Sequence, residues 1–93
     1  MNKEVFLKQK ISNFIILIRE KIGENNTIYN EFVNYQNDLN GFLRDIIQIS
    51  KLEINEELIM RYMSLKGVSK KLDKADIEKI RRYFEMFVKV VNS

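Results

Sequence analysis

Apolar side chains recur along this chain at the three- and four-residue spacing of an α-helix. The clearest series occupies residues 28–50, where the apolar positions are Ile28, Phe32, Tyr35, Leu39, Phe42, Ile46 and Ile49. Because this heptad pattern keeps its phase throughout, it predicts one continuous helix over residues 28–50. The alternative is a break in the middle, since Asp38 or Asn40 could cap a new helix.

The dipeptide Asn40-Gly41 is a turn signal inside this heptad pattern. Asn-Gly between apolar residues favours a hairpin, but a hairpin reverses the chain and gives the heptad no reason to keep its register. Gly41 also lies beside the apolar stripe and not on it. We therefore expect Gly41 within the helix, at a cost of about 1 kcal/mol relative to alanine. It would mark a weak point or a place where another group packs close.

Three further helices are predicted over residues 3–22, 56–66 and 74–91. Each of these segments has apolar residues at helical spacing, and no segment alternates as a strand would. Gly23 and Gly67 follow two of them, at the position where glycine commonly ends a helix. The predicted fold class is all-α, a small antiparallel bundle of about four helices joined by short polar loops.

Polar residues mark where these helices begin. Asn26 or Thr27 can cap the second helix, and Asn55 and Asp73 can cap the third and the last, because their side chains accept hydrogen bonds from free backbone N–H groups. The apolar positions assigned to the inner face of the third helix are Leu58, Tyr62 and Leu65.

Composition supports a folded, single-domain chain and excludes several chemistries. The 93 residues fit one domain, residues 1–93, with 45% hydrophobic and 31% charged residues. The absence of cysteine and histidine removes disulfides, Ser-His and Cys-His catalytic pairs, and the commonest metal ligands. The carboxylates show neither EF-hand spacing nor a sign of burial. We therefore expect no enzyme activity, no metal, no cofactor and no small-molecule substrate.

The longest apolar run gives no sign of a membrane segment. It spans residues 14–18, is followed at once by Arg19 and Glu20, and is far shorter than the roughly 18 residues that a transmembrane helix needs. The run is also interrupted too early for a secretory signal. The expected location is therefore cytoplasmic.

The first predicted helix carries more apolar side chains than one buried stripe requires. Beside the stripe it has Phe6, Ile16 and Leu17. A helix that is apolar on every side is normally buried on every side, which is difficult in so small a chain. Either this helix is central, or its second face contacts another protein or a second copy of the chain. Lysines near its start permit a membrane surface, which we rank last.

A second candidate surface is basic. The formal net charge is +3, and the densest group of cations comprises Lys66, Lys70, Lys71, Lys74, Lys79, Arg81 and Arg82. Such a group could bind phosphate oxygens or the acidic face of a partner. It could equally be a solvated surface, because cations are favoured at a helix C-terminus and pairs such as Glu78–Arg82 have the i,i+4 spacing. A helix-turn-helix is disfavoured, since Asp73 and Asp76 occupy its core positions.

These observations give two functional hypotheses. In size, basic charge and antiparallel helical plan the chain is similar to small bacteriocin-immunity proteins and to short phage-encoded regulators that bind a host protein; the similarity involves no motif and assigns no residue. The first hypothesis is a non-enzymatic protein-binding module, such as a regulator, inhibitor or adaptor, that contacts another protein or a second copy of itself. The alternative is a nucleic-acid-binding protein that contacts phosphates through the basic residues of 66–82.

Overall fold

Five helices make up the fold. A computed structural model describes residues 2–93, and within that range no strand is present. The helices are α1 (Lys3–Lys21), α2 (Thr27–Tyr35), α3 (Leu39–Ser50), α4 (Glu56–Leu65) and α5 (Lys74–Val91). The all-α class is therefore confirmed, and the predicted number of four helices is wrong.

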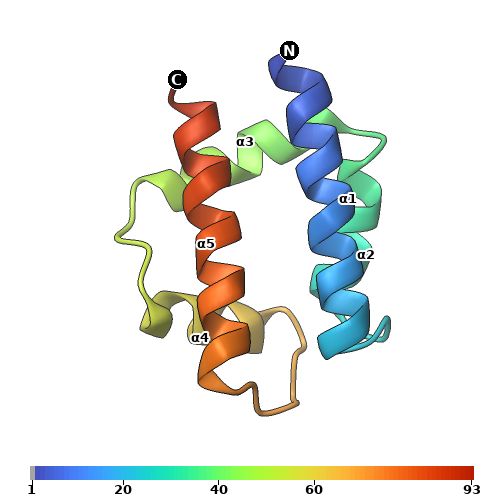
Figure 1. Cartoon of the computed structure of the whole chain (residues 1–93), viewed down its shortest axis with the longest axis vertical. Helices are drawn as coiled ribbons and strands as arrows, with labels where there is room; N and C mark the ends of the chain where they lie inside the picture. Colours follow the sequence, from blue (N-terminus) through green and yellow to red (C-terminus); the bar gives the residue numbers. More distant parts are fainter. Residues whose placement is uncertain (1) are drawn as a thin grey trace.

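The two long helices form one side of the molecule. In Figure 1, α1 and α5 run antiparallel and side by side, while α2, α3 and α4 lie behind them. Helix α1 packs against α2 and α5, and α5 packs in addition against α3 and α4. Helices α3 and α4 cross behind α5 instead of lying along it (Figure 1). Helix α5 is thus the element that most of the others share.

The predicted continuous helix over residues 28–50 is broken into α2 and α3. The break falls at Asp38, whose carboxylate Oδ1 accepts a hydrogen bond from the Gly41 N–H at 2.9 Å and so caps α3. The heptad keeps its phase across the corner because apolar residues on both sides still face one core. The rings of Tyr35 and Phe42, which flank the corner, lie 5.3 Å apart. The spacing of apolar residues indicates which face of a segment is buried, but it does not indicate whether the chain changes direction.

Gly41 is explained by the same cap. It is buried and has an ordinary negative φ, so no turn conformation requires glycine there. A Cβ at position 41 would instead lie 2.3 Å from Asp38 Oδ2 and 2.9 Å from Asp38 Cγ. The expectation that another group packs close to Gly41 is confirmed, and that group is the carboxylate that starts α3.

The other predicted helix ends are confirmed. Asn26, Asn55 and Asp73 each accept a hydrogen bond from the backbone N–H three residues ahead, at 2.8–2.9 Å. Gly23 and Gly67 follow α1 and α4 with φ angles of 103° and 81°, a left-handed conformation in which glycine has no Cβ to clash.

The core is a cluster of phenylalanine rings surrounded by isoleucine. Phe14 of α1 lies 4.5 Å from the ring of Phe32 in α2 and 5.7 Å from that of Phe84 in α5. Phe42 of α3 lies 5.1 Å from Phe87 of α5. The apolar stripe expected on α1 runs through Leu7, Ile11, Phe14, Ile18 and Ile22; the first four are buried and Ile22 is partly buried.

Helix α4 faces the core with Tyr62, as assigned, and with Ile59 and Met63. Ile59 and Met63 are buried, at 1% and 2% exposure, whereas Leu65 is 78% exposed. Leu58 and Tyr62 are only partly buried. The prediction that Leu65 belongs to the inner face is wrong, because in this short helix Ile59 and Met63 form an alternative i,i+4 pair and α5 packs on that side.

The contact between Asp38 and Gly41 predicts non-additive effects on stability. Asp38→Ala should cost about 1 kcal/mol by removing the cap. Gly41→Ala should add about 0.5–1 kcal/mol of stability only when Asp38 is already alanine, because in the wild-type background the new methyl group displaces the capping carboxylate. Urea unfolding of the four variants measures this coupling.

Asn40→Ala is the matched control for that cycle. Asn40 is exposed and lies next to Gly41, but its side chain makes no capping hydrogen bond among the described residues. Its effect should be the same in both Asp38 backgrounds. An equal gain from Gly41→Ala in both backgrounds would contradict the steric explanation.

Candidate protein-binding groove between α1 and α5

The seam between α1 and α5 is held by polar contacts at both ends. At one end Lys3 Nζ donates a hydrogen bond of 3.1 Å to the backbone oxygen of Ser93. At the other end Lys21 Nζ lies 3.7 Å from Asp76 Oδ1. The middle of the seam therefore depends on apolar packing between two antiparallel helices.

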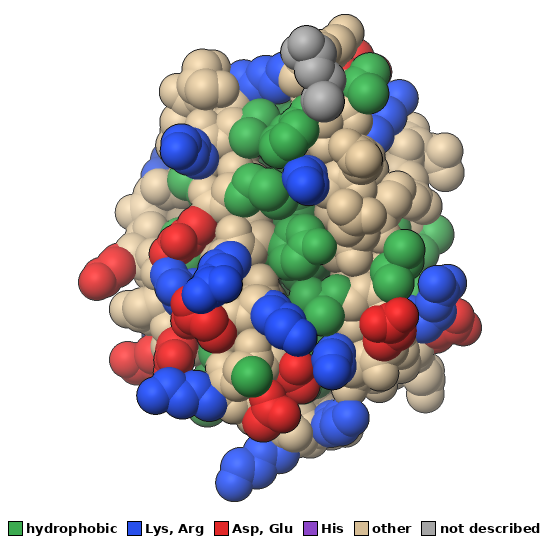
Figure 2. All heavy atoms as spheres, in the orientation of Figure 1, with side chains coloured by type: hydrophobic (Ala, Val, Ile, Leu, Met, Phe, Trp, Pro, Cys, Tyr) green, Lys and Arg blue, Asp and Glu red, His purple; other side chains and the backbone are tan. Residues whose placement is uncertain are grey.

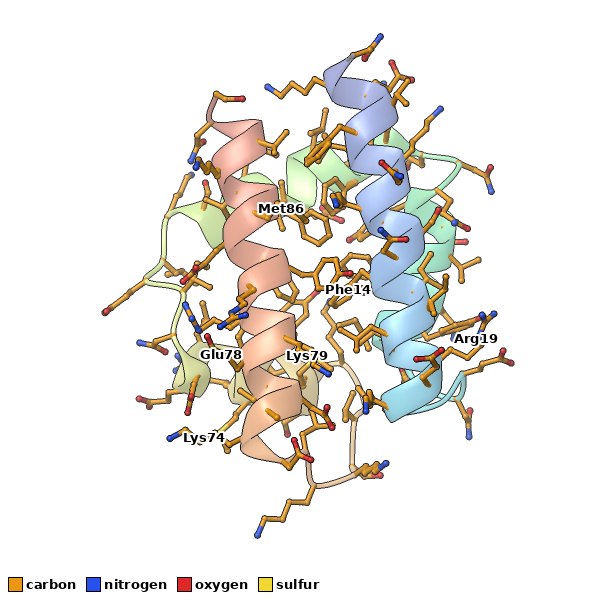
Figure 3. All side chains as sticks on the ribbon, in the orientation of Figure 1. Phe14, Arg19, Lys74, Glu78, Lys79 and Met86 are labelled. Carbon is orange, nitrogen blue, oxygen red and sulfur yellow. The ribbon has the colours of Figure 1, made fainter. Side chains whose placement is uncertain are left out.

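A groove of about 380 Å³ opens along this seam. Its lining consists of Lys10 and Leu17 from α1 and of Lys79, Arg82, Tyr83 and Met86 from α5. Figure 2 shows hydrophobic side chains in a column along the seam, with lysine and arginine side chains on both sides of it. Figure 3 shows Lys79 and Met86 on the side of α5 that is turned toward α1. We refer to these six residues as the α1/α5 groove.

The groove follows from how α5 divides its faces. Ile80, Phe84 and Phe87 point into the core and are buried. The residues that line the groove recur on the neighbouring face, at intervals of three and four. The floor rests directly on the core, because the ring of Tyr83 lies 5.3 Å from that of Phe14. The floor is therefore backed by packed side chains, which favours a preformed surface.

The rim of the α1/α5 groove is cationic on both sides. Lys10 comes from α1, with its Nζ 5.3 Å from the centre of the Phe6 ring. Lys79 and Arg82 come from α5; Lys79 is exposed and takes part in no ion pair among residues 2–93. The Arg82 side chain is 74% exposed and reaches Glu78 only at 3.3 Å. No carboxylate lines the groove.

Two carboxylates of α5, those of Glu78 and Glu85, pair with Arg81 on its other flank. Glu78 accepts hydrogen bonds from Arg81, and Arg81 also bonds Glu85. Figure 3 shows Glu78 on the side of α5 away from α1. The hydrogen bonds and positive charge of Arg81, together with a hydrogen bond from Arg82, lower the pKa of Glu78 to about 2. This ladder uses Arg81 internally, and Asp76, the carboxylate of α5 at the end of the seam, is paired with Lys21.

The basic residues predicted as one cluster do not form one patch. Lys66 Nζ binds Glu31 Oε1 at 2.8 Å, and Lys70 Nζ donates to the backbone oxygen of Lys21 at 2.8 Å. Lys71 and Lys74 are exposed and have no ion pair among the described residues; Figure 3 shows Lys74 pointing away from the groove. Of the predicted cations, the structure brings Lys79 and Arg82 into the groove.

Lys66 instead belongs to a junction between α2 and α4. Its backbone oxygen accepts hydrogen bonds from the N–H groups of Thr27 and Ile28, at 2.9 and 3.3 Å. Its ammonium pairs with Glu31 and lies 5.4 Å from the centre of the Tyr62 ring. Burial and the negative charge of Glu31 raise the pKa of Tyr62. The backbone oxygen after α4 thus accepts hydrogen bonds from the free N–H groups at the start of α2. Lys66 therefore has a structural role.

The apolar residues of α1 that were predicted to form a contact surface do not lie together. Leu17 lines the α1/α5 groove, and Phe6 is half-buried beneath Lys10. Ile16 is 43% exposed and does not line the groove. The sequence reasoning missed Lys10, Tyr83 and Met86. Their signal is that each lies four residues after a predicted site residue: Lys10 after Phe6, Tyr83 after Lys79 and Met86 after Arg82.

A second exposed apolar surface was also missed. Leu52, Met60 and Leu65 are 55%, 56% and 78% exposed. Leu52 and Leu65 border a hollow of about 350 Å³ between α4 and the end of α3, whose only charged lining residue is Arg61. Because Leu65 was expected to be buried in the core, the sequence did not predict this surface. It lacks the charges that would select one kind of partner.

Elsewhere on the described part of the chain, we find no group of side chains arranged to bind a metal ion or to catalyse a reaction. A hollow of about 830 Å³ lies between the start of α1, the α2–α3 corner and the end of α5, and most of its lining residues are polar. Its Asp38 already caps α3. In residues 2–93 no three carboxylates come together as metal ligands would. No helix in that range is long and apolar enough to cross a membrane.

Comparison of the chain with protein-family models, with curated proteins and with solved structures finds no match. The class of the protein comes from its structure alone, which is a small all-α domain of five helices. Any function has to be argued from its surface.

The junction at Lys66 predicts a stability effect. Lys66→Met should cost about 1–3 kcal/mol, because Glu31 Oε2 is buried without a hydrogen-bond partner and its carboxylate would also lose the ammonium. The double variant Glu31→Gln, Lys66→Met should recover part of that loss. Lys71→Met, which removes an exposed and unpaired lysine, should change stability by less than about 0.5 kcal/mol. Equal losses for Lys66→Met and Lys71→Met in thermal unfolding would contradict the structural role.

The Glu78 ladder predicts a dependence on acid. The pKa of Glu78 falls from its ordinary value of 4.5 to about 2 on folding. Its favourable contribution is therefore complete above pH 4.5 and is lost as the pH falls to about 2. The stability difference between wild type and Glu78→Gln should shrink over that range in urea titrations. Glu53→Gln, at an exposed carboxylate without an ion pair, should show no such change. A constant difference for Glu78→Gln would contradict the ladder.

Proposed function

We propose that this protein is a non-enzymatic protein-binding module, a small regulator, inhibitor or adaptor, and that its contact surface is the α1/α5 groove. The observation that carries the proposal is a partly buried apolar floor that opens to the surface, Leu17, Tyr83 and Met86, with cations on both sides and a packed core beneath it. Apolar grooves with a polar rim are typical of protein-recognition surfaces. The expected cytoplasmic location is kept as part of this proposal.

Binding, and not catalysis, is what the groove supports. Its titratable residues are Lys10, Lys79, Arg82 and Tyr83, and no carboxylate or second polar group lies among them to act as a general base. The floor offers contact area but no group that would polarise a substrate. The proposal therefore assigns no reaction to this surface.

Nucleic-acid binding is the weaker proposal. Lys66, Lys70 and Arg81, three of its expected phosphate ligands, are engaged within the protein by Glu31, the Lys21 backbone and Glu78. Phosphate binding remains a defined outcome of the experiment below, because it should weaken steeply with salt.

Site-specific photo-cross-linking tests the proposed contact surface. A photoreactive phenylalanine analogue placed at Lys79, on the groove rim, should cross-link a discrete protein in a nuclease-treated lysate of the source organism. The same analogue at Lys51, an exposed position in the loop after α3, is the matched control and should not. The cross-link should persist at high salt, because apolar contact contributes most of the affinity.

Leu17→Asp adds a second readout. It places a carboxylate on the apolar floor and should abolish the cross-link while circular dichroism remains helical. Leu65→Asp, at the exposed end of α4, should leave the cross-link intact. Loss with Leu65→Asp alone would place the contact on α4. In a parallel lysate without nuclease, cross-linking of nucleic acid alone would favour the second proposal. Either result would overturn the groove as the protein-binding surface.

A further inference from the structure

The form and charge of the α1/α5 groove define the kind of partner it fits. We infer that the groove binds an acidic amphipathic helix contributed by another protein, laid along the seam between α1 and α5. This inference rests on the proposed function and adds the chemistry of the occupant. Three features support it: the direction of the groove, the sign of its rim and the apolar character of its floor.

The groove is elongated along two antiparallel helices. Lys10 and Leu17 on α1 are seven residues apart, which corresponds to about 10 Å along a helix. The apolar floor lies between them and the α5 residues Tyr83 and Met86. About two turns of a helix match this length, and an apolar stripe at the i, i+3, i+4 and i+7 positions would fill the floor. The occupant would then complete a layer of three helices.

The rim selects for negative charge on both flanks of that helix. Lys10 lies on the α1 side, and Lys79 and Arg82 lie on the α5 side, without a carboxylate between them. An occupant with Glu or Asp beside its apolar stripe would pair with both sides at once. Complementary charges of this kind fix the register and raise the association rate. A basic occupant would meet like charges along the whole length.

The same charges argue against a second copy of this chain in the groove. A two-fold contact through the groove would bring the three cations of each copy against the three of the other. Such like-charge contacts are costly. The acidic residues of α5 are already paired: Asp76 with Lys21 at the end of the seam, and Glu78 and Glu85 with Arg81. The cationic rim therefore points to a different protein.

A nucleic acid matches the charge but not the floor. Leu17 and Met86 provide neither hydrogen-bond donors for phosphates nor flat surfaces for bases. Tyr83, the one aromatic residue of the lining, is half-buried and packs its ring against Phe14. Apolar floor and cationic rim together are satisfied by an amphipathic acidic helix.

Selection from a displayed peptide library tests the inference. A library of 18-residue helical peptides with all surface positions randomised is selected on the wild-type protein and depleted on Leu17→Asp. The recovered peptides should be enriched in Glu and Asp beside an apolar i, i+3, i+4, i+7 stripe. Fluorescence polarisation of a recovered peptide should show affinity that falls about tenfold for Lys10→Glu, Lys79→Glu.

The matched control is Arg44→Glu, Lys51→Glu, which makes the same change in charge on α3 and the following loop. It should leave the affinity unchanged within about twofold. Enrichment of basic or neutral peptides, or equal losses for the two double variants, would overturn the inference. If no peptide is recovered while the cross-link at Lys79 is present, the groove binds a protein but not an acidic helix. If both are absent, the proposed function fails as well.

Discussion

One cluster of aromatic rings holds the five helices together. Phe14, Phe32 and Phe42 come from α1, α2 and α3 and meet Phe84 and Phe87 of α5. Tyr62 brings α4 to the same cluster, with its ring 5.0 Å from Phe84. Because each helix contributes a ring, removal of any one helix would expose the rings of the remaining helices. The arrangement of the chain is best understood as the way to bury this cluster.

The cluster also determines which side of the molecule stays open. Helices α2, α3 and α4 cover it from behind, so only α1 and α5 remain to close the front (Figure 1). Two antiparallel helices leave a furrow between them, and Tyr83 of α5 lines it. The α1/α5 groove is therefore a consequence of having three helices on one side of the core and two on the other.

Sequence reasoning succeeded where the signal was local and failed where direction in space mattered. Asn55, Asp73 and Gly67 mark helix ends through their own backbone chemistry, so their roles could be predicted. The break at Asp38 could not be chosen, because residues on both sides of a corner still face the same core. The five helices instead of four follow from that single corner.

The candidate site shows the same limit. Leu17 and Arg82 were singled out for different reasons, one apolar and one basic, and the fold places them in one groove. Proximity along the chain suggested that Lys66 and Arg81 belong with Arg82, but each pairs with a carboxylate elsewhere. Charge counts along a sequence do not reveal which cations are already neutralised. That depends on which helices meet.

The hydrogen-bonded junction between the start of α2 and the end of α4 has a consequence for local unfolding of the protein. Helices of nine and ten residues are too short to be stable alone. Here the first N–H groups of α2 are bonded to the backbone oxygen of Lys66, just after α4. Fraying of α4 would therefore leave Thr27 and Ile28 without their acceptor, although nearly forty residues separate them along the chain. The two helices should consequently exchange their amide hydrogens as one cooperative unit.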